Sequence, residues 1–447
     1  MNSSRTCTEP GGDVCQRVLH WIEENGESVV ELLQEMIRVP SITPWFEPDP
    51  ELSQEDGVQE IIAGRMEALG AEVERWEPDP EALSEYEERP GYYADHEFEG
   101  RPNQAAVLRG GGDGRSLLLT GHVDVVPPGE GWTTDPFGGE RRDGRIYGRG
   151  AVDMKGGIAA MVGAVEAVVR SGVELVGDVT IGTVVDEEAG GMGTLALVAK
   201  GYRADACILT ESTNMKVAPL CRGILWGEVK VPGRGGHIEL PQGDWREGGA
   251  VDAIGRARML MDQIDRLNED WALRKRHPLL PLPCQVYIAK VEAGEHPTTY
   301  ADRAELTFNA QYLPEEKDDR GLGSRVKGEI EEFVARVAEV DPWLREHPPV
   351  VEWLIDADCA ETPADHPFVQ LCAANLREVG RAGELEGISF HTDMGWFVNV
   401  GIPTVNFGPG EAHVAHQNDE NVPEADLLDA TRTIALTLLD WCGTEEE

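Results

Sequence analysis

Apolar residues in the first half of the chain follow helical spacing in some segments and strand spacing in others. Residues 14–37 and 58–69 repeat apolar positions every three to four residues, which predicts two amphipathic helices, the first with a break near Gly26 and the second ended by Gly70. The next elements expected are strands at 105–108, 117–120, 179–185 and 207–209 and helices at 156–169 and 192–200. Strands that alternate with helices indicate an α/β sheet covered by helices on both faces.

Two segments lack regular spacing. Residues 1–12 are polar and include a Gly-Gly pair, which predicts a disordered tail. Residues 78–103 combine acids, aromatic residues and prolines, which predicts a long surface loop.

The pattern changes after about residue 217. Residues 224–231 alternate like an antiparallel strand. The elements expected after it are a helix at 250–267, strands at 285–291 and 304–312, a helix at 324–337 and a strand at 350–355. This order is typical of a small ferredoxin-like α+β module, and the α/β pattern then returns and ends in a helix at 424–441. We therefore predict a three-layer α/β/α domain with a mixed sheet from residues 1–217 and 357–447, interrupted by an inserted α+β domain at 218–356.

The composition limits the classes of partner that we expect this protein to bind. A chain of 447 residues is long enough for two cores. The net charge of −43 disfavours nucleic acid and anionic membranes as partners. An acidic, Lys-poor surface is typical both of a highly soluble protein and of one adapted to a salty cytoplasm. The N-terminus lacks the apolar core of a signal peptide, no run of about 18 apolar residues occurs, and the scattered Cys residues indicate reduced thiols, so we expect a cytoplasmic protein without a transmembrane helix.

Polar residues with metal-binding chemistry follow two of the predicted strands. His122 and Asp124 come after the strand at 117–120 and, two residues apart, face the same side of an extended chain. A carboxylate beside an imidazole fixes its tautomer and raises its basicity as a ligand, although such a pair is also common at an ordinary polar strand end. Asp153 lies between glycines, where it either takes part in a site or caps the following helix.

Acids and histidines complete the set. Asp186, Glu187 and Glu188 follow the strand at 179–185, where three carboxylates repel one another unless a cation or protons intervene. In so acidic a protein they could equally form a solvated turn. Glu211 follows the strand at 207–209, and His416 follows a Gly-Pro-Gly loop. Taken together, these ligand types suit two metal ions that share a bridging carboxylate, with zinc expected and cobalt or manganese as substitutes.

These five motifs, in this order, resemble the co-catalytic zinc family that includes acetylornithine deacetylase, succinyl-diaminopimelate desuccinylase, aminoacylase, carnosinase and glutamate carboxypeptidase. The resemblance runs from about Glu31 to the C-terminus. It implies Glu187 as the general base and Asp124 as the partner that orients His122. The metal ligands that it implies are His122, Asp153, Glu188, Glu211 and His416, with Asp153 bridging the two ions.

The resemblance also implies that the inserted domain is a lid or dimerisation domain. Its His237 would stabilise the tetrahedral oxyanion, often from the partner subunit of a homodimer. Where similar enzymes carry an Arg that grips a substrate carboxylate, this chain has Gln311, and Arg222 and Arg303 are candidate replacements. The substrate-binding residues expected from the resemblance are Gln311, Arg222, Gly408, Gly410 and His391, although the segment from His391 to Asp393 fits a structural role nearly as well.

The sequence thus predicts a metal-dependent amidohydrolase. We expect it to cleave the amide bond of a small N-acyl amino acid, as deacetylases and desuccinylases do. A dipeptidase or carboxypeptidase is the alternative, because the same metal site serves both reactions. An inactive metal-binding relative is a remote third reading, since no ligand and no base is missing. The segment Gly190-Gly-Met-Gly193 does not have the spacing of a dinucleotide-binding motif.

Overall fold

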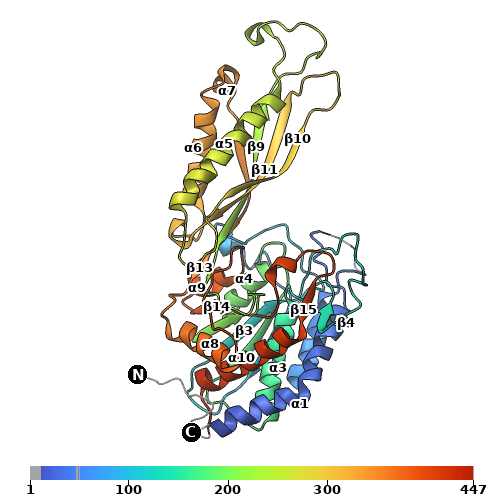
Figure 1. Ribbon diagram of the computed structural model, residues 1–447, viewed down its shortest axis with the longest axis vertical. Coiled ribbons are helices and arrows are strands. Elements are labelled where there is room, and N and C mark those ends of the chain that lie inside the picture. Colours follow the sequence, from blue (N-terminus) through green and yellow to red (C-terminus); the bar gives the residue numbers. More distant parts are fainter. Residues whose placement is uncertain (1–11, 47–48, 50, 446–447) are drawn as a thin grey trace.

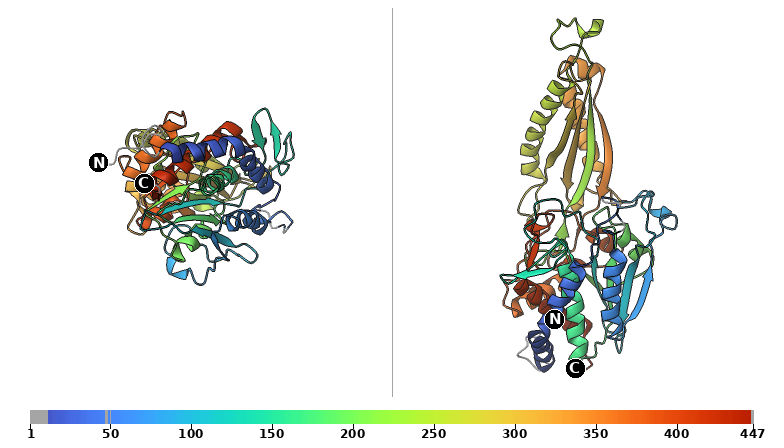
Figure 2. Two further views of the ribbon diagram at one scale, coloured as in Figure 1. Left: turned by 90° about the horizontal axis from the view of Figure 1, so that it is seen from below. Right: turned by 90° about the vertical axis from the view of Figure 1, so that its right-hand side faces the viewer.

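The computed structural model describes residues 12–46, 49 and 51–445. A larger part is built on a six-stranded sheet, and a smaller part with a four-stranded sheet extends from one end of it, so the molecule is elongated (Figures 1 and 2). The predicted tail at residues 1–11 lies outside the described residues.

The six-stranded sheet is mixed, as the sequence predicts. Its strands, in spatial order, are β1 (Glu72–Trp76), β2 (Asn103–Leu108), β6 (Val179–Val184), β3 (Leu117–His122), β7 (Ala206–Leu209) and β14 (Thr404–Asn406). The central strands β6, β3 and β7 run parallel with β14, whereas β2 is antiparallel to both β1 and β6. Strand β1 has no counterpart among the predicted elements, because its short charged sequence lacks an apolar run.

Helices cover both faces of this sheet. Leu117 and Leu119 of β3 pack in a core cluster with residues of α1 (Gly12–Ile37), α2 (Glu55–Glu67), α3 (Lys155–Arg170), α8 (Pro367–Glu378) and α10 (Glu424–Cys442). Leu118, which points to the opposite face, packs in a second cluster with residues of α4 (Met192–Ala199) and α9 (Met394–Asn399). The three-layer α/β/α arrangement is therefore confirmed.

One local prediction is wrong, and another is only partly right. Helix α1 runs without a break through Gly26, where an added Cβ atom would lie 2.9 Å from Leu428 of α10. Gly26 therefore allows the two helices to pack closely and does not interrupt the helix. The segment 78–103 is mostly irregular, with one short helical turn at Ser84–Tyr86, but it buries several residues against the core and is not simply a surface loop.

The four-stranded sheet is antiparallel and ferredoxin-like in order, β10 (Val286–Ala293), β11 (Arg303–Tyr312), β9 (Gly223–Pro232) and β12 (Val350–Ala357). Helices α5 (Ala253–Arg274) and α6 (Ser324–Ala338) pack on it, and the short α7 (Pro342–Glu346) follows α6. Asp252 accepts hydrogen bonds from the first N–H groups of α5, which fixes its start. The limits 218–356 for an inserted domain stay a prediction.

Small sheets complete the larger part. They are β15 (Asn421–Pro423) with β5 (Arg145–Tyr147) and β4 (Glu140–Arg142), and β13 (Ala360–Glu361) with β8 (Leu220–Cys221). Within the described residues, every helix is too short or too polar to cross a membrane.

Candidate functional site

Several candidate ligands lie at the carboxyl ends of three neighbouring parallel strands. His122 is the last residue of β3, Glu187 and Glu188 follow the end of β6, and Glu211 follows the end of β7. Because β6, β3 and β7 are adjacent and parallel, these ends meet at one edge of the sheet. The fold therefore brings together residues that are up to 89 positions apart in the sequence.

His122 presents one free nitrogen to this edge. Its Nδ1 atom is 2.9 Å from the backbone carbonyl oxygen of Asp124 and donates to it, which leaves Nε2 facing the cluster. This Nε2 atom lies 3.2 Å from Asp153 Oδ1, 3.7 Å from Glu211 Oε1 and 3.8 Å from Glu187 Oε2. A buried imidazole nitrogen that faces several carboxylates is the arrangement of a metal ligand.

The carboxylate of Asp153 lies between two imidazoles. Its Oδ1 faces His122, and its Oδ2 is 3.1 Å from Nε2 of His416. The same His416 nitrogen is 3.1 Å from Glu188 Oε2, while Glu188 Oε1 is buried and has no hydrogen-bond partner. The cluster thus divides into two halves that share Asp153, which fits two cations about 3.5–4 Å apart.

Asp124 holds this arrangement together. It is fully buried, and its two carboxylate oxygens accept the backbone N–H groups of Glu187 at 3.3 Å and Glu188 at 3.1 Å. Its Oδ1 also lies 3.5 Å from Nδ1 of His122. One carboxylate therefore fixes the His at the end of β3 relative to both acids beyond the end of β6.

The cluster holds more acids than the two imidazoles can balance. Burial raises the pKa of Glu187 well above its usual range, against the opposing effect of His122. Burial and the neighbouring Asp153 raise the pKa of Glu211 to about 8. Hydrogen bonds to Asp153 and Glu188 raise the pKa of His416 to about 11. A cluster that retains protons in this way is one where divalent cations can take their place, so the donor set fits metal ions.

A second group adjoins the first. Ligand atoms of Glu187, His391 and Asp393 lie within 4.8 Å of one another, as do those of His122, Asp153 and Glu188. The predicted segment from His391 to Asp393 therefore lies beside the candidate general base.

Comparison with known proteins gives the family. The family described as peptidase family M20/M25/M40 matches residues 118–440. The chain belongs to this family. It is a hydrolase that acts on amide bonds.

Relatives and solved structures agree with this assignment. The N-formyl-4-amino-5-aminomethyl-2-methylpyrimidine deformylase of Bacillus subtilis is 30% identical over 445 residues, covering 95% of this chain and 97% of the relative. The succinyl-diaminopimelate desuccinylase of Methylobacterium radiotolerans is 28% identical over 427 residues, covering 90% and 93%. Human carnosine dipeptidase 1 shares the fold with a TM-score of 0.67 at 17% identity, covering 96% of this chain and 99% of that one.

His237 lies apart from the cluster in this peptidase-family chain. It is exposed, in the loop after β9, and forms an isolated bridge with Thr299 between β10 and β11. Strand β9 has ten residues and so spans about 33 Å between this loop and the larger part. Figure 1 shows β9 leading away from the larger part, so within one chain the loop that carries His237 does not reach the metal-ligand candidates.

The proposed carboxylate-binding residues are engaged with other groups. Arg222 is buried, donates to Gln311 Oε1 at 2.8 Å and also bonds the carbonyl oxygen of Leu282. Arg303 is exposed at the start of β11 and lies 3.7 Å from Glu295. In the described structure, Arg303 therefore faces solvent, and the Arg222–Gln311 pair forms a link within the protein.

Gly408 and Gly410 allow the His416 loop to approach the sheet. An added Cβ atom on Gly408 would lie 2.4 Å from the carbonyl oxygen of Thr210, and Gly410 has a φ of +87° with Val152 at 2.6 Å from its added Cβ atom. These contacts give the glycines a role in loop packing.

Sequence reasoning missed Glu420. It is fully buried, accepts N–H groups of Val152 at 3.0 Å and Asp153 at 3.2 Å, and forms an ion pair with buried Arg149. Because Glu420 follows His416 by four residues, it connects the loops that carry both residues. Its place in the acidic run Asn-Asp-Glu gave no signal of burial.

A second missed group surrounds Asp186. This residue has a φ of +72°, and its carboxylate is 2.8 Å from His96 Nδ1 and accepts from Arg101 at 3.2 Å. Arg101 also pairs with buried Glu55 at the start of α2. Two segments distant in sequence, one with His96 and Arg101 and one with Glu55, thus fix the residue that precedes Glu187.

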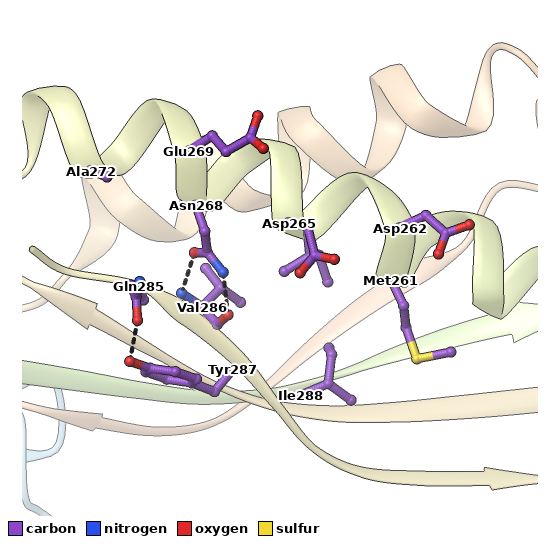
Figure 3. Close-up of a pocket in the computed structure, with 11 residues that line it drawn as sticks. Met261, Asp262, Asp265, Asn268, Glu269, Ala272, Gln285, Val286, Tyr287 and Ile288 are labelled. Atoms are coloured by element: carbon purple, nitrogen blue, oxygen red, sulfur yellow. Dashed lines mark hydrogen bonds between the residues drawn. The ribbon is translucent and has the colours of Figure 1, made fainter.

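A separate groove of 620 Å³ lies between α5 and the edge strand β10 (Figure 3). Asn268 of α5 bonds both the backbone N–H and the carbonyl of Val286, which fastens the helix to this strand. None of the metal-ligand candidates lines the groove.

Proposed function

We propose that this protein is a two-metal N-deacylase, which hydrolyses the amide bond between a small acyl group and an amine. The observation that carries the proposal is the Asp153 carboxylate, whose two oxygens face His122 and His416 separately at 3.2 and 3.1 Å. Glu211 would complete the half that contains His122, and Glu188 the half that contains His416. Imidazole with carboxylate favours zinc, with cobalt or manganese as substitutes.

The protein groups have distinct tasks in this reaction. Bound divalent ions supply a polarised acyl carbonyl and an attacking water of lowered pKa. Glu187 accepts the proton of that water and delivers it to the leaving nitrogen as the C–N bond breaks, so that a carboxylic acid and an amine are released. Asp124 keeps Glu187 and His122 in register through the bonds described above.

The full-length relatives favour deacylation. The deformylase and the desuccinylase cover at least nine tenths of this chain, and their names describe removal of a formyl or a succinyl group. An N-acyl amino acid was the sequence-based candidate substrate, and a dipeptide or C-terminal peptide bond is the alternative. Solved dipeptidases share the fold at identities below 20%. At such identities the shared fold does not indicate a shared substrate.

Homodimerisation is part of the proposal. His237 could stabilise the oxyanion only in a neighbouring copy, because β9 separates it from the cluster of its own chain. Mixing Glu187→Gln chains with His237→Ala chains tests this directly. Activity regained on mixing, above that of either variant alone, supports the shared site, and strictly additive residual activity contradicts it.

The first experiment measures metal content by mass spectrometry together with hydrolysis of N-formyl, N-acetyl and N-succinyl amines and of dipeptides. About two ions per chain, with activity lost on chelation and restored by zinc, are expected. Hydrolysis of dipeptides alone would replace deacylation by the peptidase alternative. A chain without bound metal and without metal dependence would refute the site.

A further inference from the structure

The group beside the candidate base is made of side chains that can accept hydrogen bonds. His391 Nδ1 is 2.8 Å from the carbonyl oxygen of Asp358 and donates to it, which leaves Nε2 on the side of Asp393. This Nε2 lies 3.9 Å from Asp393 Oδ1. With Glu187 within 4.8 Å of both, we name these three residues the acceptor wall.

Asp393 has an oxygen that the protein leaves unbonded. Its Oδ2 accepts from Thr194 Oγ1 at 2.5 Å, whereas Oδ1 is buried and has no hydrogen-bond partner. Gly191 packs against this oxygen, since an added Cβ atom there would lie 2.4 Å from it. An unsatisfied, buried carboxylate oxygen is costly, and its position in the wall indicates that a donor from outside the chain belongs there.

In the described part of the chain, the buried Arg and Lys side chains around the site are not available to balance the wall. Each is bonded elsewhere: Arg222 to Gln311, Lys155 to the carbonyls of Met36 and Val39, Arg101 to Glu55 and Asp186, and Arg149 to Glu420. A substrate carboxylate at the wall would therefore meet like charge. An amine, amidine or amino-heterocycle would find three acceptors.

We propose that the acceptor wall binds N–H donors of the leaving amine, so that the enzyme selects N-acyl amines whose leaving part is cationic or rich in N–H groups and rejects those that carry a carboxylate. The inference rests on the proposed N-deacylase function. It follows from the place of Glu187, which delivers its proton to the leaving nitrogen and so puts that nitrogen next to His391 and Asp393. The wall thus determines specificity on the amine side of the scissile bond.

Three probes of one chain length separate the charges: N-formylputrescine with a cationic end, N-formylbutylamine with a neutral end and N-formyl-γ-aminobutyrate with a carboxylate end. We expect kcat/KM for N-formylputrescine to exceed that for N-formyl-γ-aminobutyrate by roughly tenfold or more, the effect of one hydrogen bond to a charged group. Calorimetric binding of putrescine and γ-aminobutyrate to the zinc-loaded protein should show the same order.

Two variants test the wall itself. Asp393→Asn keeps the shape and the bond to Thr194 but turns the free oxygen into a donor, so the preference for the cationic probe should fall about tenfold, with a smaller loss on the neutral probe. His391→Asn keeps a donor near the carbonyl of Asp358 and removes Nε2, and a smaller shift in the same direction is expected. Asp178→Asn, at the opposite end of β6 beside Arg109, is the control for the lost charge.

The outcomes separate the two proposals. Equal losses on all three probes in Asp393→Asn would make Asp393 structural, and preference for the carboxylate probe in the wild type would overturn the inference. A third metal ion that binds to the wild-type protein but not to Asp393→Asn would also overturn the inference. If no probe is hydrolysed but putrescine binds and Asp393→Asn weakens that binding about tenfold, the N-deacylase function fails for these amides while the wall stands.

Discussion

Acids of the four-stranded part pair with cations of the chain, whereas acids outnumber cations at the candidate metal site of the larger part. In the four-stranded part, Glu329 accepts from Trp271 Nε1 at 2.8 Å and pairs with Arg274 and Lys275. Nearby, Asp356 lies 2.8 Å from Lys327. At the edge of the six-stranded sheet, two imidazoles face four acids, namely Asp153, Glu187, Glu188 and Glu211.

This difference distinguishes acids that stabilise the fold from acids that can bind a metal ion. Acids that find cations within the chain complete their interactions on folding, and they add to stability without outside help. Where acids outnumber cations at a buried site, the carboxylates repel one another, and a cation bound from solution relieves this repulsion. Folding at such a site is therefore coupled to metal binding. Substitutions in the two parts should therefore change different observables.

The largest effect is expected from Glu187→Gln. It removes the proton acceptor while keeping the side-chain shape, so kcat should fall by about 10²- to 10⁴-fold. Metal content measured by mass spectrometry should stay at the wild-type level, because Glu187 is not one of the proposed ligands. Asp178→Asn, remote from the site, serves as the control for the change in charge. Turnover like that of the wild type would contradict the assignment of Glu187.

The sequence predicts the fold well where periodicity is long and apolar. The helix found at Lys155–Arg170 and the strand at Val179–Val184 match their predictions closely, because small or β-branched residues fill both. The structure brings the sequence-predicted metal-ligand candidates together, since each follows a predicted parallel strand or a glycine-rich loop and such ends meet at one edge; their role as ligands stays a prediction.

The rest depended on contacts between distant segments. The burial of Glu420 comes from backbone N–H groups more than 260 positions away, and that of Asp186 comes from His96 and Arg101 in a segment without periodicity. A sequence reading that assigns acids to solvent by default misses such residues. The engagement of Arg222 with Gln311 likewise appears only once β9 and β11 pair.

In the four-stranded part, Phe308→Ala should change stability without changing the metal site. Phe308 is 2% exposed and packs edge-on against Trp353 with ring centroids 5.5 Å apart. Truncation should cost about 3–5 kcal/mol of unfolding free energy, measured by urea denaturation. Val350→Ala, on an exposed residue of β12, is the control. Loss of bound metal from folded Phe308→Ala protein would show that the two parts are coupled.

A smaller effect on the metal site is expected from Glu420→Gln. It weakens the bonds that hold the backbone of Val152 and Asp153 and leaves Arg149 without its ion partner. Groups that orient ligands in this way typically change metal affinity by about 10- to 100-fold, so zinc titration should show a loss within that range. Glu424→Gln, which removes a surface pair with Arg141, is the matched control. Equal zinc affinity in both variants would remove Glu420 from the support of the site.

The smallest effect concerns Glu329, which pairs with cations of its own chain. Burial raises its pKa, but hydrogen bonds from Arg274 and Lys275 lower it by more. The pKa in the folded state therefore lies below the ordinary value of 4.5. The carboxylate therefore stabilises the fold above pH 4.5, and this contribution is lost as the pH falls through the folded pKa. Glu329→Gln should cost about 1 kcal/mol or less at pH 7 by urea denaturation, and the difference from wild type should shrink as the pH falls below 4.5 and through the folded pKa. Glu332→Gln, at an exposed pair with Arg336, should show no such trend. A difference that stays constant across this pH range would mean that packing of the side chain, and not its charge, is what Glu329 contributes.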